Sequence, residues 1–292
     1  MHRWKITGAL YGAAAAACYG MNPLFALPLL AAGIGVNSVL FYRYVLAVLI
    51  FGLWIKFVKK IPLKINRTEF LSLFAMGLLF SFSSLTLFMS YNFMDAGIAS
   101  TLLFIYPVIV AVLMAIFFKE RLSTNAILSI ILTTLGIALL YKGKDGQDLN
   151  FIGVLLVFIS SLTYALYIIG VKNIKTLKHI NTAKLSFYVM LFGLLVYIFN
   201  LKFCTELQII NKPVLWLSAF ALSILPTIVS LEAMTISIKL IGSTSAAVLG
   251  ALEPVTAIFF GVVVFHEQLT PRIIVGIITI LTAVLMIILS RR

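Results

Sequence analysis

The stretch IASTLLFIYPVIVAVLMAIFFKERLS at residues 98–123 recurs in altered form as SAAVLGALEPVTAIFFGVVVFHEQLT at residues 245–270. A displacement of 147 positions places Pro107-Val108 on Pro254-Val255, and alanine, leucine, phenylalanine and glutamate recur at matching places on both sides. Each run is long and apolar enough for an α-helix that crosses the hydrocarbon layer. A repeat over this distance indicates that the chain is duplicated.

Composition extends this interpretation to the whole chain of 292 residues, of which 62% are hydrophobic and 11% are charged. The apolar runs are long and do not alternate with polar residues, as the strands of a membrane β-barrel would. The sequence predicts an all-α membrane protein with ten transmembrane helices. The predicted spans are Ile6–Leu30, Val36–Val58, Phe70–Tyr91, Ile98–Phe118, Thr124–Tyr141, Phe151–Val171, Ala183–Asn200, Pro213–Ile238, Thr244–Phe265 and Pro271–Leu289.

The repeat divides these spans into two units of five helices, residues 1–145 and residues 146–292. Because five is odd, the second unit must enter the membrane from the opposite side. The sequence therefore predicts two inverted five-helix repeats, an arrangement typical of secondary transporters. A displacement of 145 positions also brings Tyr19 onto Tyr164 in the first helix of each half.

Most of the 22 lysine and arginine residues fall in loops on the side that carries both termini. Basic residues accumulate on cytoplasmic loops, so we expect a multi-pass protein of the inner (cytoplasmic) membrane with both termini in the cytoplasm. This topology explains the net charge of +13 without a nucleic-acid partner, because the basic residues are spread over short loops. The lipid bilayer is the expected surrounding. Cys18 and Cys204 have no metal-like spacing.

Glu253 is the most informative residue, because an acid at the bilayer midplane costs about 2.5–3.5 kcal/mol on insertion scales. We expect it to face the protein interior. Pro254 has no N–H for the Gly250 carbonyl, so the helix should open just before Glu253 and leave a free carbonyl beside the acid. Glu253 is the first candidate for proton coupling. The alternative is a structural acid bonded to a neighbouring helix.

The two copies agree on the proline but differ just before it, where Tyr106 occupies the position of Glu253. This predicts a symmetric pair of hinges at Pro107 and Pro254 with an asymmetric site between them. In the first span, the Asn22-Pro23 pair predicts a further bend. Asn22 is accordingly a candidate binding residue, and Pro23 is a candidate hinge.

Two more charged residues fall within predicted spans. Glu232 is interpreted either as a functional acid or as an interior acid paired with a lysine or with a serine or threonine hydroxyl. Arg43 either extends outward to the membrane edge or faces an interior acid or an anionic substrate. A pair between Arg43 and Glu253 is one arrangement that the sequence allows.

Aromatic and hydroxyl side chains complete the candidate site. Ser81, Ser84, Phe88 and Tyr91 share one face of the third span, and Tyr164 lies in the sixth. Such a stripe is either helix packing or the lining of a cavity. If it lines a cavity, the site suits a neutral or zwitterionic organic molecule.

The motifs together resemble the paired domains of the EamA family in the drug/metabolite transporter superfamily. The resemblance rests on Tyr19-Gly20-Met21-Asn22-Pro23, Tyr42-Arg43-Tyr44, Tyr106-Pro107, Phe118-Lys119-Glu120-Arg121-Leu122-Ser123, Leu252-Glu253-Pro254-Val255 and Glu267-Gln268-Leu269-Thr270. It implies a cavity lined by the first, third and fourth helices of each half, with the fifth at the periphery. It also implies cargo among amino acids, nucleotides, sugars and other metabolites. Ser123 and Thr270 are predicted N-caps of the fifth helices.

We therefore predict a secondary active transporter, an exporter of a small amino-acid-like or drug-like metabolite that works by alternating access with proton coupling. An uncoupled facilitative carrier and a non-transporting membrane scaffold or receptor are the alternatives. An enzyme is not expected, because no H-E-x-x-H motif or flanked nucleophile occurs in the sequence. No cofactor or metal is expected either. The sequence does not determine the oligomeric state.

Overall fold

The computed structural model describes residues 3–94, 96–120, 124–140, 150–265 and 271–289. Within these ranges the regular structure is helical and contains no strand. The helices are α1 Arg3–Tyr19, α2 Asn22–Ala31, α3 Val36–Trp54, η1 Ile55–Lys59, α4 Arg67–Ser90, α5 Ala96–Leu103, α6 Tyr106–Phe118, α7 Thr124–Leu140, α8 Phe151–Asn173, α9 Lys175–Lys178, α10 Thr182–Asn200, α11 Pro213–Ser223, η2 Ile224–Val229, α12 Ser230–Ile241, α13 Ser243–Leu249, α14 Leu252–Phe265 and α15 Pro271–Leu289, where η1 and η2 are π-helical.

The predicted all-helical class is confirmed for the described residues. By length and composition, six helical stretches can cross a membrane: Trp4–Ala31, Val36–Lys59, Arg67–Ser90, Phe151–Asn173, Thr182–Asn200 and Pro213–Ile241. The apolar helix α6 is shorter than these. The predicted N-caps Ser123 and Thr270 lie outside the described residues.

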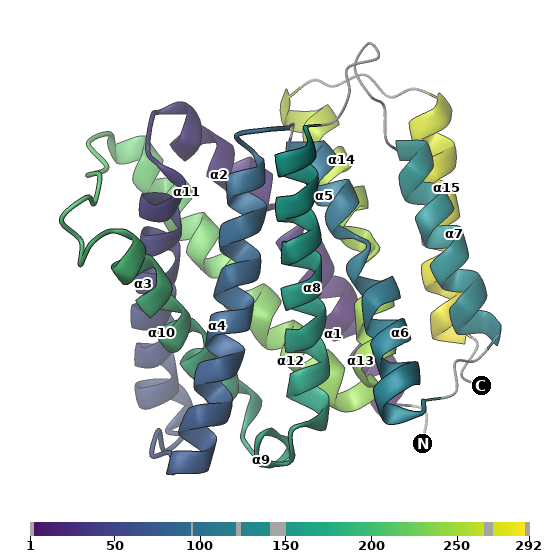
Figure 1. Ribbon diagram of the computed structural model, residues 1–292, viewed down its shortest axis with the longest axis horizontal. Coiled ribbons are helices and arrows are strands. Elements are labelled where there is room, and N and C mark those ends of the chain that lie inside the picture. Colours follow the sequence, from purple (N-terminus) through teal and green to yellow (C-terminus); the bar gives the residue numbers. More distant parts are fainter. Residues whose placement is uncertain (1–2, 95, 121–123, 141–149, 266–270, 290–292) are drawn as a thin grey trace.

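The helices run up and down along one common direction (Figure 1). α1 begins and α15 ends at the same end of the molecule, where α9 also lies. α7 and α15 pack against each other at one edge. This is where the family resemblance placed the fifth helices.

Among the described residues, three helical passages are interrupted, between α1 and α2, between α5 and α6, and between α13 and α14, and the passage from α11 to α12 contains the π-helical segment η2. Two glycines let these interruptions approach other chain segments closely. A β-carbon on Gly20 would lie 2.5 Å from the carbonyl oxygen of Glu253, and one on Gly250 would lie 1.6 Å from the hydroxyl of Tyr106. The site described below therefore depends on residues without side chains at both positions.

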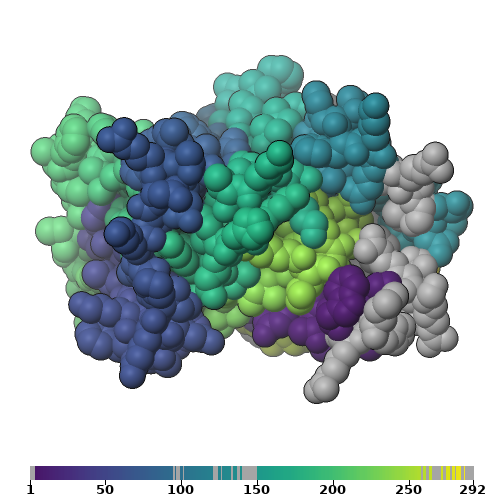
Figure 2. Space-filling model, turned by 90° about the horizontal axis from the view of Figure 1, so that it is seen from below, coloured from purple at the N-terminus to yellow at the C-terminus, as the bar shows by residue number. Residues whose placement is uncertain are grey.

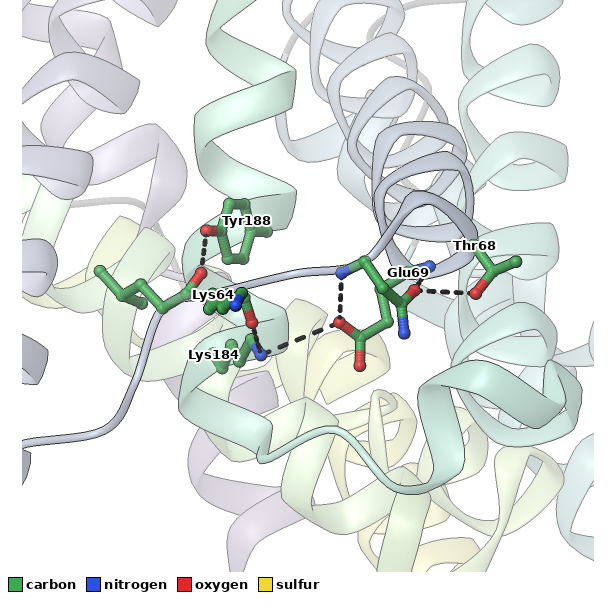
Figure 3. A network of polar contacts seen from close by, with 7 residues as sticks. Lys64, Thr68, Glu69, Lys184 and Tyr188 are labelled. Carbon is green, nitrogen blue, oxygen red and sulfur yellow. Dashed lines mark hydrogen bonds and ion pairs between the residues drawn. The ribbon is translucent and has the colours of Figure 1, made fainter.

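At the lower end of the molecule, the connection between η1 and α4 is fastened to α10. The Tyr188 hydroxyl donates to the Leu63 carbonyl, and the Lys184 ammonium donates to the Lys64 carbonyl (Figure 3). We call this set the Leu63 clasp. Figure 2 looks onto this end and shows the blue η1–α4 segment close to the green residues around α9 and α10.

A capping box fixes the start of α4 beside the Leu63 clasp. The Asn66 side chain accepts from the Glu69 amide at 2.7 Å, and the Glu69 carboxylate accepts from the Asn66 amide at 3.0 Å. Lys184 Nζ lies 4.0 Å from the same carboxylate. The ion pair between Lys184 and Glu69 therefore links the clasp to the cap.

A second set of bonds joins the connection after α10 to the beginning of α3. The Tyr42 hydroxyl donates to the Gln208 carbonyl at 3.1 Å, and the Gln208 amide donates to Ser38 Oγ at 3.1 Å. The Gly35 amide donates to the Gln208 side chain. We call this set the Gln208 clasp.

Candidate functional site

The break before Glu253 is closed by the chain itself. Pro254 cannot donate to the Gly250 carbonyl, and α13 ends at Leu249, as the sequence predicted. However, the Glu253 amide donates to that carbonyl at 2.8 Å. The prediction of a free carbonyl beside the acid is wrong, because a tighter turn lets the preceding N–H take the acceptor that the proline leaves.

The equivalent break in the first half is closed by a neighbouring helix. Pro107 leaves the Leu103 carbonyl without its helical donor, and Ser161 Oγ of α8 donates to it at 3.0 Å. Tyr106, at the first position of α6, is fully buried. The break thus places Tyr106 in the interior.

A third break lies in the π-helical segment η2 and was not foreseen. Pro226 leaves the Leu222 carbonyl unpaired, and Thr227 Oγ1 donates to it at 2.8 Å. Arg43 Nε then donates to Thr227 Oγ1 at 2.6 Å, and Arg43 Nη2 donates to the Pro226 carbonyl at 3.2 Å. The arginine of α3 therefore completes the hydrogen bonding of a widened helix.

Glu253 and Tyr106 meet in the centre of the molecule. Glu253 is 4% exposed, and the Tyr106 hydroxyl donates to its Oε1 at 3.5 Å. The Tyr106 ring packs edge-on against Tyr164, with centroids 4.8 Å apart. Tyr164 in turn stacks on Tyr19, with centroids 6.1 Å apart. Four predicted or repeat-related residues thus form one contiguous group, which we call the central cluster.

Aromatic rings surround the guanidinium of Arg43. Its Cζ lies 5.9 Å from the ring centroids of Tyr19 and Tyr44 and 5.6 Å from that of Phe88. The Tyr44 hydroxyl is 3.2 Å from Ser84 Oγ. Tyr19 therefore belongs to the central cluster and also contacts Arg43. Of the predicted stripe, Phe88 packs on the cation itself, and Ser84 contacts the neighbouring Tyr44.

Arg43 is 0% exposed, so it does not extend outward to the membrane edge. Arginine remains charged in proteins, and burying such an ion costs several kcal/mol. Its two hydrogen bonds offset about 1.5–3 kcal/mol each, and desolvated cation–π contacts offset about 2 kcal/mol. None of these contacts supplies negative charge. Among the described residues, no ion pair joins Arg43 to Glu253.

Glu232 belongs to a separate network. Thr182 Oγ1 donates to one carboxylate oxygen at 2.6 Å, and Ser186 Oγ donates to the other at 2.7 Å. Lys239 donates instead to two backbone carbonyls. This geometry matches the expected pairing with hydroxyls. Over the described parts of the chain, no group of three histidine, cysteine, aspartate or glutamate side chains could hold a metal ion.

Asn22 is 2% exposed, and both polar atoms of its amide lack a hydrogen-bond partner. It begins α2 directly after the first interruption, with Pro23 next in the first turn. Buried amides are ordinarily bonded, so an unpaired one marks a position with unused hydrogen-bonding capacity.

The structure thus brings Tyr19, Tyr106, Tyr164 and Glu253 together and leaves Glu232 apart. Sequence reasoning missed Thr227, although a threonine directly after a proline inside an apolar span was a usable sign. Ser and Thr hydroxyls can take the carbonyl that such a proline frees.

Comparison with known proteins identifies the family. The profile of the EamA-like transporter family matches residues 6–142 and again residues 151–289. The chain belongs to the EamA-like transporter family. Membership in this family supports a transporter role and indicates that the chain is a multi-pass membrane protein. It also suggests that the chain is not an enzyme.

The chain is also similar to a curated protein and to a solved structure. The EamA-like chain is 25% identical over 201 residues to the uncharacterized transporter YvbV of Bacillus subtilis (strain 168), an alignment that covers 67% of the chain and 64% of that relative. A solved crystal structure matches with a TM-score of 0.77 at 16% identity and covers 96% of this chain and 95% of the other. At that identity the likeness concerns the fold alone.

Proposed function

We propose that the chain is a secondary transporter that exports a small organic metabolite across the cytoplasmic membrane by alternating access, with Glu253 as its proton-coupling residue. The proposed architecture has ten transmembrane helices in two inverted repeats, residues 1–145 and 146–292. Both termini are cytoplasmic in this proposal.

The helix packing supports the repeat. α1 packs on α12, and α8, the first helix of the second half, packs on α4 in the same way. α3 packs on α11 as α10 packs on α4, and α1 packs on α13 and α14 as α8 packs on α5 and α6. Each of these contacts between the halves therefore has a counterpart in which the roles are exchanged, as expected for two units related by an approximate twofold axis.

The two clasps support the same relation. Tyr42 and Tyr188 are 146 positions apart, and Leu63 and Gln208 are 145 positions apart, which agrees within one or two positions with the repeat displacements of 145 and 147. In each clasp the tyrosine hydroxyl donates to a backbone carbonyl of the other half. The two clasps are therefore equivalent contacts, formed at corresponding positions of the two halves.

The central cluster is the observation that carries the proposal. Tyr106 and Glu253 are equivalent in the repeat and contact each other, and so do Tyr19 and Tyr164. A residue can meet its own counterpart only beside the axis that relates the two halves. Transporters of this plan bind their cargo near such an axis. In the described residues of the cluster, Glu253 is the titratable acid.

A carboxyl group at this position can couple two processes. It carries a charge when ionised and none when protonated, so a proton changes the electrostatics of the place where the halves meet. Such a change shifts the balance between inward-open and outward-open states only if the two states bind the proton with different affinities. The equivalent tyrosine keeps a neutral hydrogen-bonding group on the other half.

The test uses purified protein in proteoliposomes, with cargo chosen by screening metabolites for a rise in thermal stability. Glu253→Gln should abolish accumulation driven by a proton gradient while sparing counterflow. Glu232→Gln is the matched control, because that acid lies outside the central cluster, and it should retain gradient-driven accumulation.

Other outcomes decide between the alternatives. If the wild type performs counterflow but never accumulates cargo against a gradient, the chain is an uncoupled carrier. Equal loss of both activities in Glu253→Gln, or loss of neither, rejects the coupling role. A correctly folded protein that moves no cargo in either assay would be a scaffold or receptor.

A further inference from the structure

Arg43 contacts two interrupted helices at once. Its Nε and Nη2 donate to Thr227 and to the Pro226 carbonyl in η2. The same guanidinium packs on Tyr19, the last residue of α1 before the first interruption. One cation on α3 therefore fixes the hydrogen bonding of one break and the packing of the other.

Arg43 contacts irregular segments of two packed helices, and the helix pair at the equivalent place in the repeat has no such segments. α1 packs on α12, which continues from η2, and this pair is interrupted in both members. The equivalent pair is α4 and α8, and each of these is continuous. Arg43 therefore lies beside the helix pair that contains both a break, between α1 and α2, and a π-helical segment, η2.

The third nitrogen of Arg43 is unused. Nη1 is buried and has no hydrogen-bond partner. The guanidinium is surrounded by Tyr19, Tyr44 and Phe88, whose ring faces attract a cation but carry no net negative charge. Within the described ranges, the salt bridges are formed by lysines and not by Arg43. The site therefore has a fixed positive charge and two free N–H groups.

We propose that Arg43 Nη1 binds an oxyanion of the cargo, a carboxylate or a phosphate, and that this contact transmits binding to both interrupted helices. A carboxylate or phosphate oxygen accepts from guanidinium N–H groups and neutralises the charge. As the guanidinium turns toward the anion, its bonds to η2 and its packing on Tyr19 change together. This inference rests on the proposed transport function and adds the charge class of the cargo.

The first experiment measures thermal unfolding of the purified chain in sodium acetate, sodium phosphate and sodium chloride at equal ionic strength. Acetate or phosphate should raise the Tm above that in chloride by about 2–4 °C, saturably, and Arg43→Gln should abolish the difference. Thr163→Val is the matched control, because it removes a hydroxyl that donates within the continuous helix α8 and leaves Arg43 and its bonds to η2 in place. It should retain the shift.

Comparing the Tm shifts in acetate and in phosphate also distinguishes a carboxylate cargo from a phosphorylated cargo. A shift with acetate alone assigns a carboxylate cargo, and a shift with phosphate alone assigns a phosphorylated one. No shift with either anion, or an equal shift in Arg43→Gln, overturns the proposal.

A second measurement needs no variant and covers the case in which Arg43→Gln does not fold. Cys18 lies one residue before Tyr19, and Cys204 lies in the connection after α10, and both are free thiols. Acetate or phosphate should change the rate of Cys18 alkylation at least about twofold relative to Cys204, because it shifts the end of α1. An unchanged ratio of rates would contradict the transmission to that helix.

Both readouts are independent of transport. An anion effect in a protein that moves no cargo would support the anion site at Arg43, but it would remove the transporter proposal and with it the assignment of the anion to a cargo. Transport of cargo without any anion effect would do the reverse.

Discussion

Thr227 offers the sharpest test of how the third break is stabilised. Thr227→Val keeps the shape of the side chain but removes Oγ1, which donates to the Leu222 carbonyl and accepts from Arg43 Nε. A buried group left without its partner costs about 1–3 kcal/mol, and more if it is charged. Two such groups predict a loss of about 2–6 kcal/mol in the free energy of unfolding.

The assay is equilibrium unfolding in mixed micelles with an increasing fraction of denaturing detergent. Thr163→Val is the control, because the Thr163 hydroxyl donates to the Ile159 carbonyl within the continuous helix α8 and its loss should cost within about 0.5 kcal/mol. Pro226→Ala then supplies an N–H that can take the Leu222 carbonyl.

When Pro226→Ala is already present, Thr227→Val should lower the free energy of unfolding by about 1–3 kcal/mol less than it does in the wild type. The difference measures the hydrogen bond to the Leu222 carbonyl, because both substitutions act on that acceptor. The reasoning is refuted if Thr227→Val costs no more than the control, or if Pro226→Ala leaves its cost unchanged.

Two further predictions concern close packing and the clasps. A β-carbon on Gly193 would lie 2.0 Å from Ser81 Oγ, so Gly193→Ala should destabilise the protein by about 1–3 kcal/mol in the same unfolding assay. Ser81→Ala should restore part of this loss and cost little alone, because that hydroxyl has no partner; failure to rescue would contradict the contact. Tyr42→Phe and Tyr188→Phe should each cost about 1–2 kcal/mol, measured likewise, and strongly unequal losses would argue against equivalent clasps.

The sequence predicted the all-helical class because membrane helices leave strong local marks. Long apolar runs located the helices, and the paired prolines located the interruptions before Tyr106 and Glu253. A proline acts on its own chain through the missing N–H, so its effect can be foreseen without neighbours. The identity of the new donor cannot, because Ser161 and Leu103 are 58 positions apart.

The candidate site was predictable in part for the same reason. Repeat alignment made Tyr106 the counterpart of Glu253, but only the packing of the two halves shows that these counterparts meet. Arg43 was singled out as a charged residue within an apolar span. Its partner Thr227 lies 184 positions away and became relevant only through the widened helix around it. Long-range contacts of this kind have no local pattern in the chain.

The clasps also set an order of events during synthesis. The hydrogen bond to the Leu63 carbonyl cannot form until Tyr188 is made, 125 residues later. The bond from Tyr42 cannot form until Gln208 is made, 166 residues later. At about 5–20 residues per second, these delays are roughly 6–30 s. During that time the first half sits in the membrane with its connections unfastened. Final assembly must therefore follow translation of the second half, and the first half made alone should be a target for quality-control proteases.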